Sequence, residues 1–162
     1  MSGVETNKNG VAILFNNTFE CKIFKVFRDP DGIYVILDVE IMKKRITLAN
    51  VYGPSSCDKP DFFHNISNQI DRMGNQLIIA GGDCTVLLNI TIDARNYKGY
   101  VNRPRARRKI QEIMDKYELV DVWLEVYPEK RGYTWRKFNT VQQGRLDCFL
   151  ISEELMLDVN GV

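Results

Sequence analysis

Short apolar runs separated by turn residues dominate the first third of the chain. The run at residues 33–40, Ile-Tyr-Val-Ile-Leu-Asp-Val-Glu, is rich in β-branched and aromatic residues, which favours a strand. The sequence Asp-Pro-Asp-Gly at residues 29–32 is a strong turn signal, so residues 22–40 are predicted as a β-hairpin. Buried strands are also predicted at residues 10–15 and 45–52, the second of which ends at Gly53-Pro54.

Two later segments carry apolar residues at helical spacing. Residues 58–73 are predicted as a helix, with Asp58 as its cap and Pro60 in its first turn. Residues 104–117 are predicted as a second helix. The apolar face of the first carries Phe62, Phe63, Ile66, Ile70 and Met73, and that of the second carries Ile110, Ile113 and Met114.

The remaining apolar segments are short and lie between and after these helices. Strands are predicted at residues 76–80, 133–135 and 145–151, and a short apolar segment at residues 119–126. Strands come first and helices then alternate with strands, which favours a layered α/β fold with a mixed sheet. No repeat or linker interrupts the chain, so a single domain over residues 10–162 is predicted, preceded by a polar segment at residues 1–9.

The segment Leu77-Ile-Ile-Ala-Gly-Gly-Asp83 is the part of the sequence that most clearly indicates a functional site. Four apolar residues in a row predict a strand buried on both faces, and the glycine pair is expected to end it. An acid just past such a strand lies at the rim of a sheet, where α/β folds commonly place their chemistry. Asp83 is therefore the first candidate site residue.

Composition narrows the class of protein. The 162 residues include 44% hydrophobic and 27% charged residues, with a net charge of +1, as in an ordinary globular domain. Four scattered cysteines and a single histidine, His64, argue against structural zinc and favour reduced thiols in a cytosolic or nuclear protein. Cys84 is expected to be a small buried hydrophobe and His64 a helix-surface residue. Neither a membrane span nor a signal peptide is predicted.

Four short motifs occur in a specific order. They are Asn50-Val-Tyr-Gly-Pro54, Gly81-Gly-Asp83, Tyr133-Thr-Trp135 and Gly144-Arg-Leu-Asp147. Together they resemble the endonuclease/exonuclease/phosphatase superfamily, which has the fold of DNase I and the apurinic/apyrimidinic endonucleases. Within it, the chain is most similar to the endonuclease domain of LINE-type retrotransposons, especially those abundant in fish genomes. The resemblance implies a layered α/β sandwich of DNase I-like type with mixed sheets.

The resemblance also implies a Mg²⁺- or Mn²⁺-dependent phosphodiesterase that nicks DNA. Such chemistry needs carboxylates near the metal and donors that stabilise the charged transition state. By the family motifs, Asp83 orients the attacking water, Tyr52 contacts phosphate, and Asp147 belongs to the metal and phosphate region. Thr85 takes the position of the family's phosphate-binding asparagine. Asn50, Thr134 and Arg145 fall where the family contacts DNA, and Arg145 or a metal is the expected partner of a buried Asp147.

The departures from the family pattern bear on activity. Thr85 replaces an asparagine, Cys84 a phenylalanine and Gly144 a serine. The family's metal-holding glutamate and its acid/base histidine have no counterpart by pattern, although Val4-Glu5-Thr6 echoes the glutamate motif. We therefore expect a fold that lacks its first strands and its final histidine-bearing strand, with weak or no nuclease activity.

Several alternatives stay open. The basic cluster at residues 103–109, with Arg105, Arg107 and Arg108, fits either a phosphate-binding patch or a solvated helix start. Tyr133 and Trp135 fit the core better than a base-stacking platform. The whole chain also fits a catalytically dead remnant that binds nucleic acid, or an interaction module that dimerises or swaps strands through exposed sheet edges.

Overall fold

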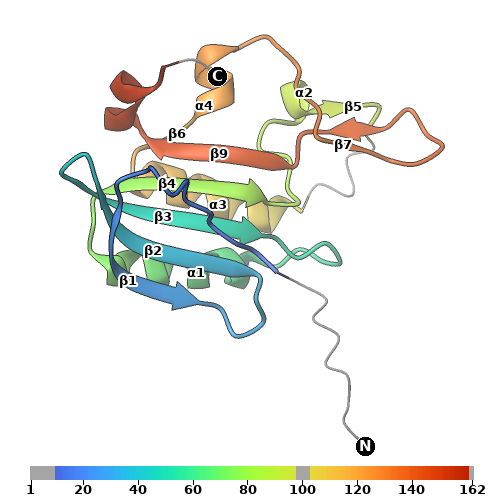
Figure 1. Ribbon diagram of the computed structural model, residues 1–162. Coiled ribbons are helices and arrows are strands. Elements are labelled where there is room, and N and C mark those ends of the chain that lie inside the picture. Colours follow the sequence, from blue (N-terminus) through green and yellow to red (C-terminus); the bar gives the residue numbers. More distant parts are fainter. Residues whose placement is uncertain (1–9, 98–102, 161–162) are drawn as a thin grey trace, which may run out of the picture.

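The main body of the computed structural model is a six-stranded mixed sheet (Figure 1). The structure describes residues 10–97 and 103–160. In spatial order the strands are β1 (Lys22–Arg28), β2 (Tyr34–Ile41), β3 (Lys44–Tyr52), β4 (Leu77–Asp83), β9 (Asp147–Ser152) and β6 (Leu119–Asp121). Only β3 and β4 are parallel, and the other neighbours are antiparallel. The predicted hairpin, the third strand and the mixed sheet are confirmed. The polar segment predicted at residues 1–9, with its glutamate echo, lies outside the described residues.

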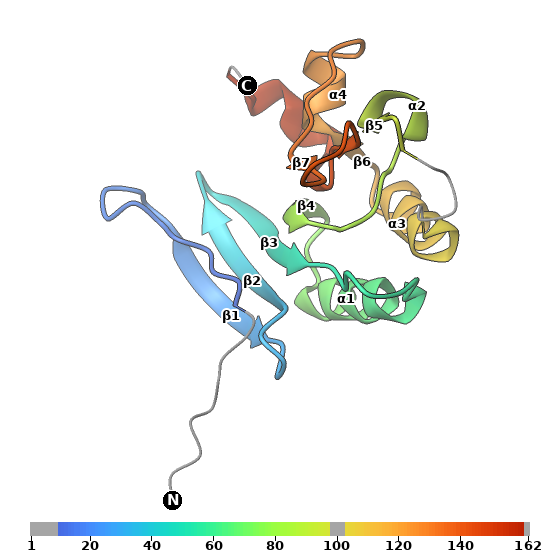
Figure 2. The same ribbon diagram turned by 90° about the vertical axis from the view of Figure 1, so that its right-hand side faces the viewer.

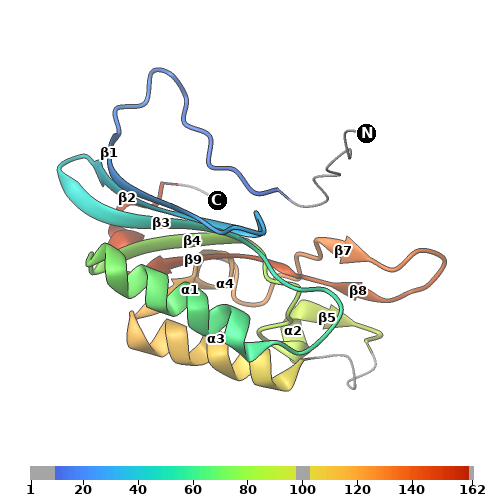
Figure 3. The same ribbon diagram turned by 90° about the horizontal axis from the view of Figure 1, so that it is seen from below.

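Two helices cover one face of this sheet. They are α1 (Pro60–Met73) and α3 (Pro104–Lys116), and both lie on the same side in Figures 2 and 3. Ile70 of α1 and Ile110 of α3 pack with Ile36 and Ile78 of the sheet in the larger core cluster. Each helix has a proline in its first turn and one apolar side, as predicted. Among the described residues no helix is both long enough and apolar enough to span a membrane.

The opposite face of the main sheet is covered by an irregular segment and by short helices. Residues 10–20 cross it without forming a strand (Figure 3), so the strand predicted at residues 10–15 is wrong. A strand needs a neighbour to satisfy its backbone, and this segment runs over the face of the sheet rather than along one of its edges (Figure 3). Ile13 and Phe15 pack onto the smaller core cluster while Leu14 stays 91% exposed. The short helix α4 (Val122–Val126) and the 3₁₀ helix η2 (Glu153–Asp158) border the same cluster.

A small three-stranded antiparallel sheet stands at one end of the main sheet. Its order is β5 (Ala94–Arg95), β8 (Gln143–Gly144) and β7 (Trp135–Arg136), and the short helix α2 (Ile90–Asp93) leads into it. Of the strand predicted at residues 133–135, only Trp135 is in a strand. The strand predicted at residues 145–151 begins instead at Asp147, because Arg145 and Leu146 connect the small sheet to β9.

Two local expectations are corrected. Strand β4 does not stop at its glycine pair but continues through Gly81 and Gly82 to Asp83. Gly82 has a φ of +129°, and a side chain there would collide with the carbonyl of Val51, so this position requires glycine for close strand contact. Asp58 does not cap α1, whose N-terminal flanking residue is Lys59. Its carboxylate instead accepts hydrogen bonds from the backbone N–H groups of Arg105 (3.0 Å) and Ala106 (2.7 Å), at the start of α3.

Candidate active site

Three predicted site residues meet at one edge of the main sheet. Tyr52 ends β3 and is the registered partner of Asp83, which ends β4. Asp83 is in turn the registered partner of Asp147, the first residue of β9. The backbone N–H of Gly53 donates to the Asp83 carbonyl at 2.6 Å, so the first two strand ends are held together beyond the sheet. Residues far apart in the sequence therefore share one corner because of strand order.

The environment of Asp83 disfavours its charge. Burial raises the pKa of the Asp83 carboxyl, and the facing carboxylate of Asp147 raises it further. The backbone N–H of Thr85 donates to Asp83 Oδ1 at 2.7 Å, and this bond, with the positive charge of Arg103, acts in the opposite direction. The net direction is upward, so burial and the neighbouring carboxylate together outweigh the hydrogen bond from Thr85 and the charge of Arg103.

Asp147 is exposed, which differs from the buried acid expected. Residues alternate along β9, so Asp147 and Phe149 are exposed while Cys148 and Leu150 are buried. The Thr134 hydroxyl accepts hydrogen bonds from the backbone N–H groups of Leu146 (3.1 Å) and Asp147 (3.3 Å). Thr134 thus fixes the start of β9, and the Asp147 carboxylate stays open to solvent and to cations.

Arg145 is buried and does not pair with Asp147. Its Nε lies 2.8 Å from Asp93 Oδ1, and its Nη1 lies 2.8 Å from Asp121 Oδ2. The three side chains are 6%, 1% and 5% exposed, respectively. Asp121 also accepts a hydrogen bond from the backbone N–H of Trp123 at the start of α4. Arg145 therefore joins α2, β6 and the approach to β9, and this burial leaves it almost no surface for the expected DNA contact.

Two other predicted site residues donate their side-chain hydrogen bonds to backbone carbonyls of the protein. The Thr85 hydroxyl donates to the Pro54 carbonyl at 3.0 Å, and its backbone has a positive φ of 53°. The hydroxyl is therefore already committed, unlike the free phosphate donor expected at this position. The Asn50 amide donates to the Ala12 carbonyl at 2.8 Å and borders a separate hollow with Gly81 and Phe149.

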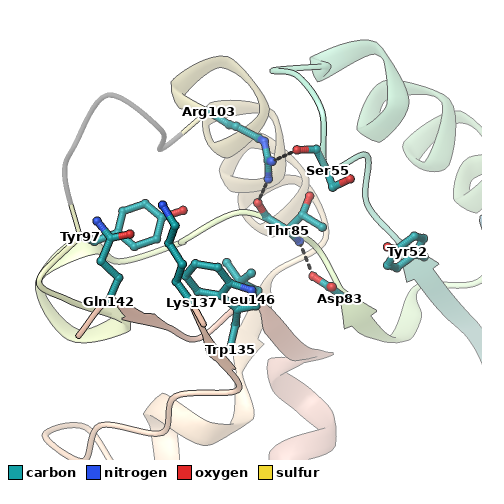
Figure 4. Close-up of a pocket in the computed structure, with 10 residues that line it drawn as sticks. All are labelled: Tyr52, Ser55, Asp83, Thr85, Tyr97, Arg103, Trp135, Lys137, Gln142 and Leu146. Carbon is teal, nitrogen blue, oxygen red and sulfur yellow. Dashed lines mark hydrogen bonds between the residues drawn. The ribbon is translucent and has the colours of Figure 1, made fainter. Parts of the chain in front are cut away.

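A cavity of about 470 Å³ opens beside Asp83 and Tyr52 (Figure 4). The rings of Tyr97 and Trp135 meet edge to face on its wall, with centroids 6.2 Å apart. Arg103 reaches in from the other side, where its guanidinium donates to the carbonyls of Thr85 and Ser55. The full lining is Tyr52, Ser55, Asp83, Thr85, Tyr97, Arg103, Trp135, Lys137, Gln142 and Leu146.

Most of this lining was missed by sequence reasoning. Trp135 is half-buried at the cavity wall rather than a core residue. Lys137 and Gln142 flank the turn between β7 and β8, and the backbone N–H of Lys137 donates to the Gln142 carbonyl at 3.1 Å. The sequence signal nearest to this wall was a pair of aromatic residues, Tyr133 and Trp135, followed by the cations Arg136 and Lys137.

The basic cluster begins at this cavity and continues along α3. Arg103 lines the cavity, Arg105 and Arg108 are exposed, and Arg107 is half-buried. Of the ion pairs between described residues, the one from this cluster joins Lys109 to Glu112 at 2.9 Å. The arginines on the first two turns thus form none of the ion pairs found between described residues.

Asp83 and Asp147 fit a metal site in which the protein supplies only one or two of the ligands. Within residues 10–97 and 103–160, no three His, Cys, Asp or Glu side chains come together as a metal-binding group. Mg²⁺ is commonly held by one or two carboxylates together with waters and substrate phosphate. Asp83 and Asp147 fit that arrangement, because they are registered partners at the ends of neighbouring strands. His64 is exposed on α1, as predicted.

Comparison with solved structures identifies the fold. The chain is similar to the 3'-5' exonuclease NExo of Neisseria meningitidis, with a TM-score of 0.63 and 20% identity over 82% of this chain and 57% of that one. It is also similar to the AP endonuclease LMAP of Leishmania major (TM-score 0.60, 19% identity, 78% and 48% of the two chains). The endonuclease domain of TRAS1, a telomere-specific non-LTR retrotransposon, gives a TM-score of 0.58 and 15% identity over 85% of this chain and 59% of that domain.

One curated relative links the chain to a transposon. The transposon TX1 uncharacterized 149 kDa protein of Xenopus laevis is 29% identical over 151 residues, which are 91% of this chain and 11% of that protein. No family model matches the chain. The chain spans about half the length of the solved structures and about a ninth of the transposon protein. The predicted DNase I-like fold is confirmed, and the curated relative is a transposon protein.

Proposed function

We propose that this chain is an endonuclease-like domain of a LINE-type retrotransposon that binds DNA beside Asp83 and nicks it weakly or not at all by itself. The observation that carries the proposal is the juxtaposition of Tyr52, Asp83 and Asp147 at one strand edge, next to a cavity with cationic walls. The solved structures of this fold include an AP endonuclease and a retrotransposon endonuclease domain, and a DNA substrate is carried over from them.

Charge around the cavity supports a phosphate backbone as ligand. Arg103 and Lys137 line the cavity, and Arg105 and Arg108 extend the positive charge along α3. Arginine and lysine contacts to phosphates supply most of the sequence-independent affinity for DNA and make that affinity fall steeply with salt. The aromatic pair Tyr97 and Trp135 adds an apolar wall against which a sugar or base can pack.

Divalent metal fits the two carboxylates. Asp83 and Asp147 would hold Mg²⁺ or Mn²⁺ jointly with a substrate phosphate. When bound, such an ion lowers the pKa of water and offsets the charge of the phosphate. Tyr52, 40% exposed beside Asp83, can orient the same phosphate through its hydroxyl.

Weak or absent catalysis follows from the groups that surround these carboxylates. The chain has one histidine, and it lies exposed on α1, on the helical layer rather than among the cavity residues. A missing general base typically costs about 10²-fold to 10⁴-fold in rate. The Thr85 hydroxyl is bound to Pro54, which further reduces the donors available to a scissile phosphate.

A dimerising interaction module is the second candidate. Strand β1 forms one edge of the main sheet, and its Ile23 and Val26 are 48% and 41% exposed. However, β1 carries Lys22, Lys25 and Arg28 and no acid. Antiparallel pairing of two such edges would bring cations together, which disfavours a dimer of this kind. DNA binding is therefore the better supported function.

The test is duplex-DNA binding followed by fluorescence anisotropy from 25 to 200 mM salt, with and without Mg²⁺. We expect binding that weakens steeply with salt and strengthens when Mg²⁺ replaces EDTA. The double variant Asp83→Asn/Asp147→Asn should still bind DNA in a salt-sensitive way, but Mg²⁺ should no longer increase its affinity. Absence of binding at the lowest salt would contradict the proposal, and light scattering of the same sample would detect a dimer.

A further inference from the structure

Two cysteines directly follow the two site carboxylates. Cys84 comes after Asp83, and Cys148 comes after Asp147. Their Sγ atoms lie 2.8 Å apart, although the residues are 64 positions apart in the sequence. The backbone N–H of Cys84 donates to the Leu146 carbonyl at 3.0 Å, so the main chains that carry the two thiols are held together.

These thiols differ from the other two in the chain. Cys84 and Cys148 are 4% and 9% exposed, whereas Cys21 is half-buried and Cys57 is exposed. Both buried thiols belong to the larger core cluster, where their surroundings are fixed. A disulfide needs a bond of about 2.05 Å and little backbone movement. The observed separation exceeds that by less than an ångström, so small side-chain rotations would close it.

We propose that Cys84 and Cys148 form a redox modification site: an intrachain disulfide that ties the end of β4 to the start of β9. The oxidant is hydrogen peroxide. Cys148 loses its S–H proton and gains oxygen as a sulfenic acid while the peroxide is reduced to water. Cys84 then attacks the Cys148 sulfur, an S–S bond forms, and a second water leaves. In total two thiols lose two electrons and two protons to one peroxide.

The order of these two steps follows from how accessible each thiol is to peroxide. Cys148 borders an open hollow of about 440 Å³, together with Trp123, Asp147 and Phe149, whereas Cys84 does not. Cys148 is only 9% exposed and belongs to the core cluster, so its oxidation is expected to be slow. The disulfide would fix the spacing of Asp83 and Asp147, but it does not depend on the proposed DNA binding.

The experiment uses the variant Cys21→Ser/Cys57→Ser, which keeps only the buried pair. After incubation with hydrogen peroxide, denaturation and alkylation, we expect a mass loss of 2 Da and no alkylated thiol. Tryptic mapping should then find the peptides of Cys84 and Cys148 joined. Two alkylated thiols both after this incubation and after refolding in a glutathione redox buffer would overturn the proposal, as would a bond between different molecules.

Two further measurements keep the proposal falsifiable if access limits the native protein. Refolding the same variant in a glutathione redox buffer should form the bond and raise the melting temperature by roughly 10 °C, since it closes a long loop. Replacing Cys84 as well, by Cys84→Ser, should leave a Cys148 sulfenic acid that dimedone labels. No bond after refolding, or labelling of Cys84 in a Cys148→Ser variant but not of Cys148, would contradict the assignment.

Discussion

Asp83 and Asp147 are registered partners at the end of the β4–β9 pair, and each carries a carboxylate toward the same corner of the sheet. Directly opposed like charges destabilise a strand pair, so this arrangement has an energetic cost. At Asp83 burial is the larger cause of the raised pKa, and the Asp147 carboxylate raises that pKa further. Carboxyl groups with perturbed pKa values cluster at functional sites, which makes this pair a candidate site.

The first prediction concerns stability and pH. Because the Asp83 pKa is raised in the folded state, its contribution to stability is present below the unfolded pKa of about 3.9 and is lost as the pH rises through the folded pKa. Asp83→Asn should therefore melt roughly 1–3 °C higher than the wild type at pH 7, with the difference vanishing near pH 3.5. Calorimetry at the two pH values measures this.

Asp71 provides the matched control. Hydrogen bonds from Lys116 and Tyr117 lower the pKa of Asp71, so its charged form stabilises the fold at neutral pH. Asp71→Asn should lower the melting temperature at pH 7, the opposite sign to Asp83→Asn. Millimolar Mg²⁺ should raise the melting temperature of the wild type and not that of Asp83→Asn. Two variants that shift in the same direction would refute the electrostatic account of this corner.

The second prediction concerns the buried arginine. Removing Arg145 leaves Asp93 and Asp121 as buried carboxylates without their cation. Arg145→Met should lower the free energy of unfolding by about 3–5 kcal/mol, whereas the exposed Arg136→Met should change it by less than about 0.5 kcal/mol. Urea unfolding measures both. A stable Arg145→Met protein with weakened DNA binding would instead favour a direct DNA contact.

The third prediction concerns the cap that α3 receives from another segment. Asp58 accepts the N–H groups of Arg105 and Ala106, which α3 cannot satisfy internally. Asp58→Ala should destabilise the protein by about 1 kcal/mol, and Asp58→Asn should recover most of the loss. Equal losses in both variants would show that the acceptor oxygens are not what matters.

The fourth prediction separates DNA affinity from folding. Arg105→Ala/Arg108→Ala removes two exposed charges from α3 and should leave the melting temperature unchanged. Duplex affinity should fall about tenfold, and the slope of log affinity against log salt should decrease by about 2. Lys43→Ala, at the exposed turn between β2 and β3, is the control and should leave that slope in place. An unchanged slope in the double arginine variant would assign these side chains to a solvated helix start.

The corner of the sheet could be predicted because its residues follow strands. Tyr52 and Asp83 each come directly after a β-rich run, and parallel neighbours end at the same edge. The apolar faces of both helices were also readable from spacing alone. The strand predicted at residues 10–15 failed because its pattern describes apolar positions but contains no information on whether a pairing neighbour exists.

Long-range partners could not be predicted. Asp93 lies 52 positions from Arg145, and nothing local distinguishes a buried arginine from one that contacts DNA. Asp58 precedes α1 and carries a good capping side chain, yet its carboxylate bonds to a helix 47 and 48 positions away. Tyr97 meets Trp135 only because the small sheet folds against the cavity, which no periodicity in either segment indicates.

The most direct test of the account is the relaxation of supercoiled plasmid by the purified chain in Mg²⁺ or Mn²⁺, beside Asp83→Ala, under conditions in which both bind duplex DNA. Because the single histidine of the chain lies on α1 and not among the cavity residues, the account predicts that the wild type nicks no faster than Asp83→Ala. Rapid, metal-dependent nicking by the wild type that disappears in Asp83→Ala would contradict it and would establish the chain as an active endonuclease.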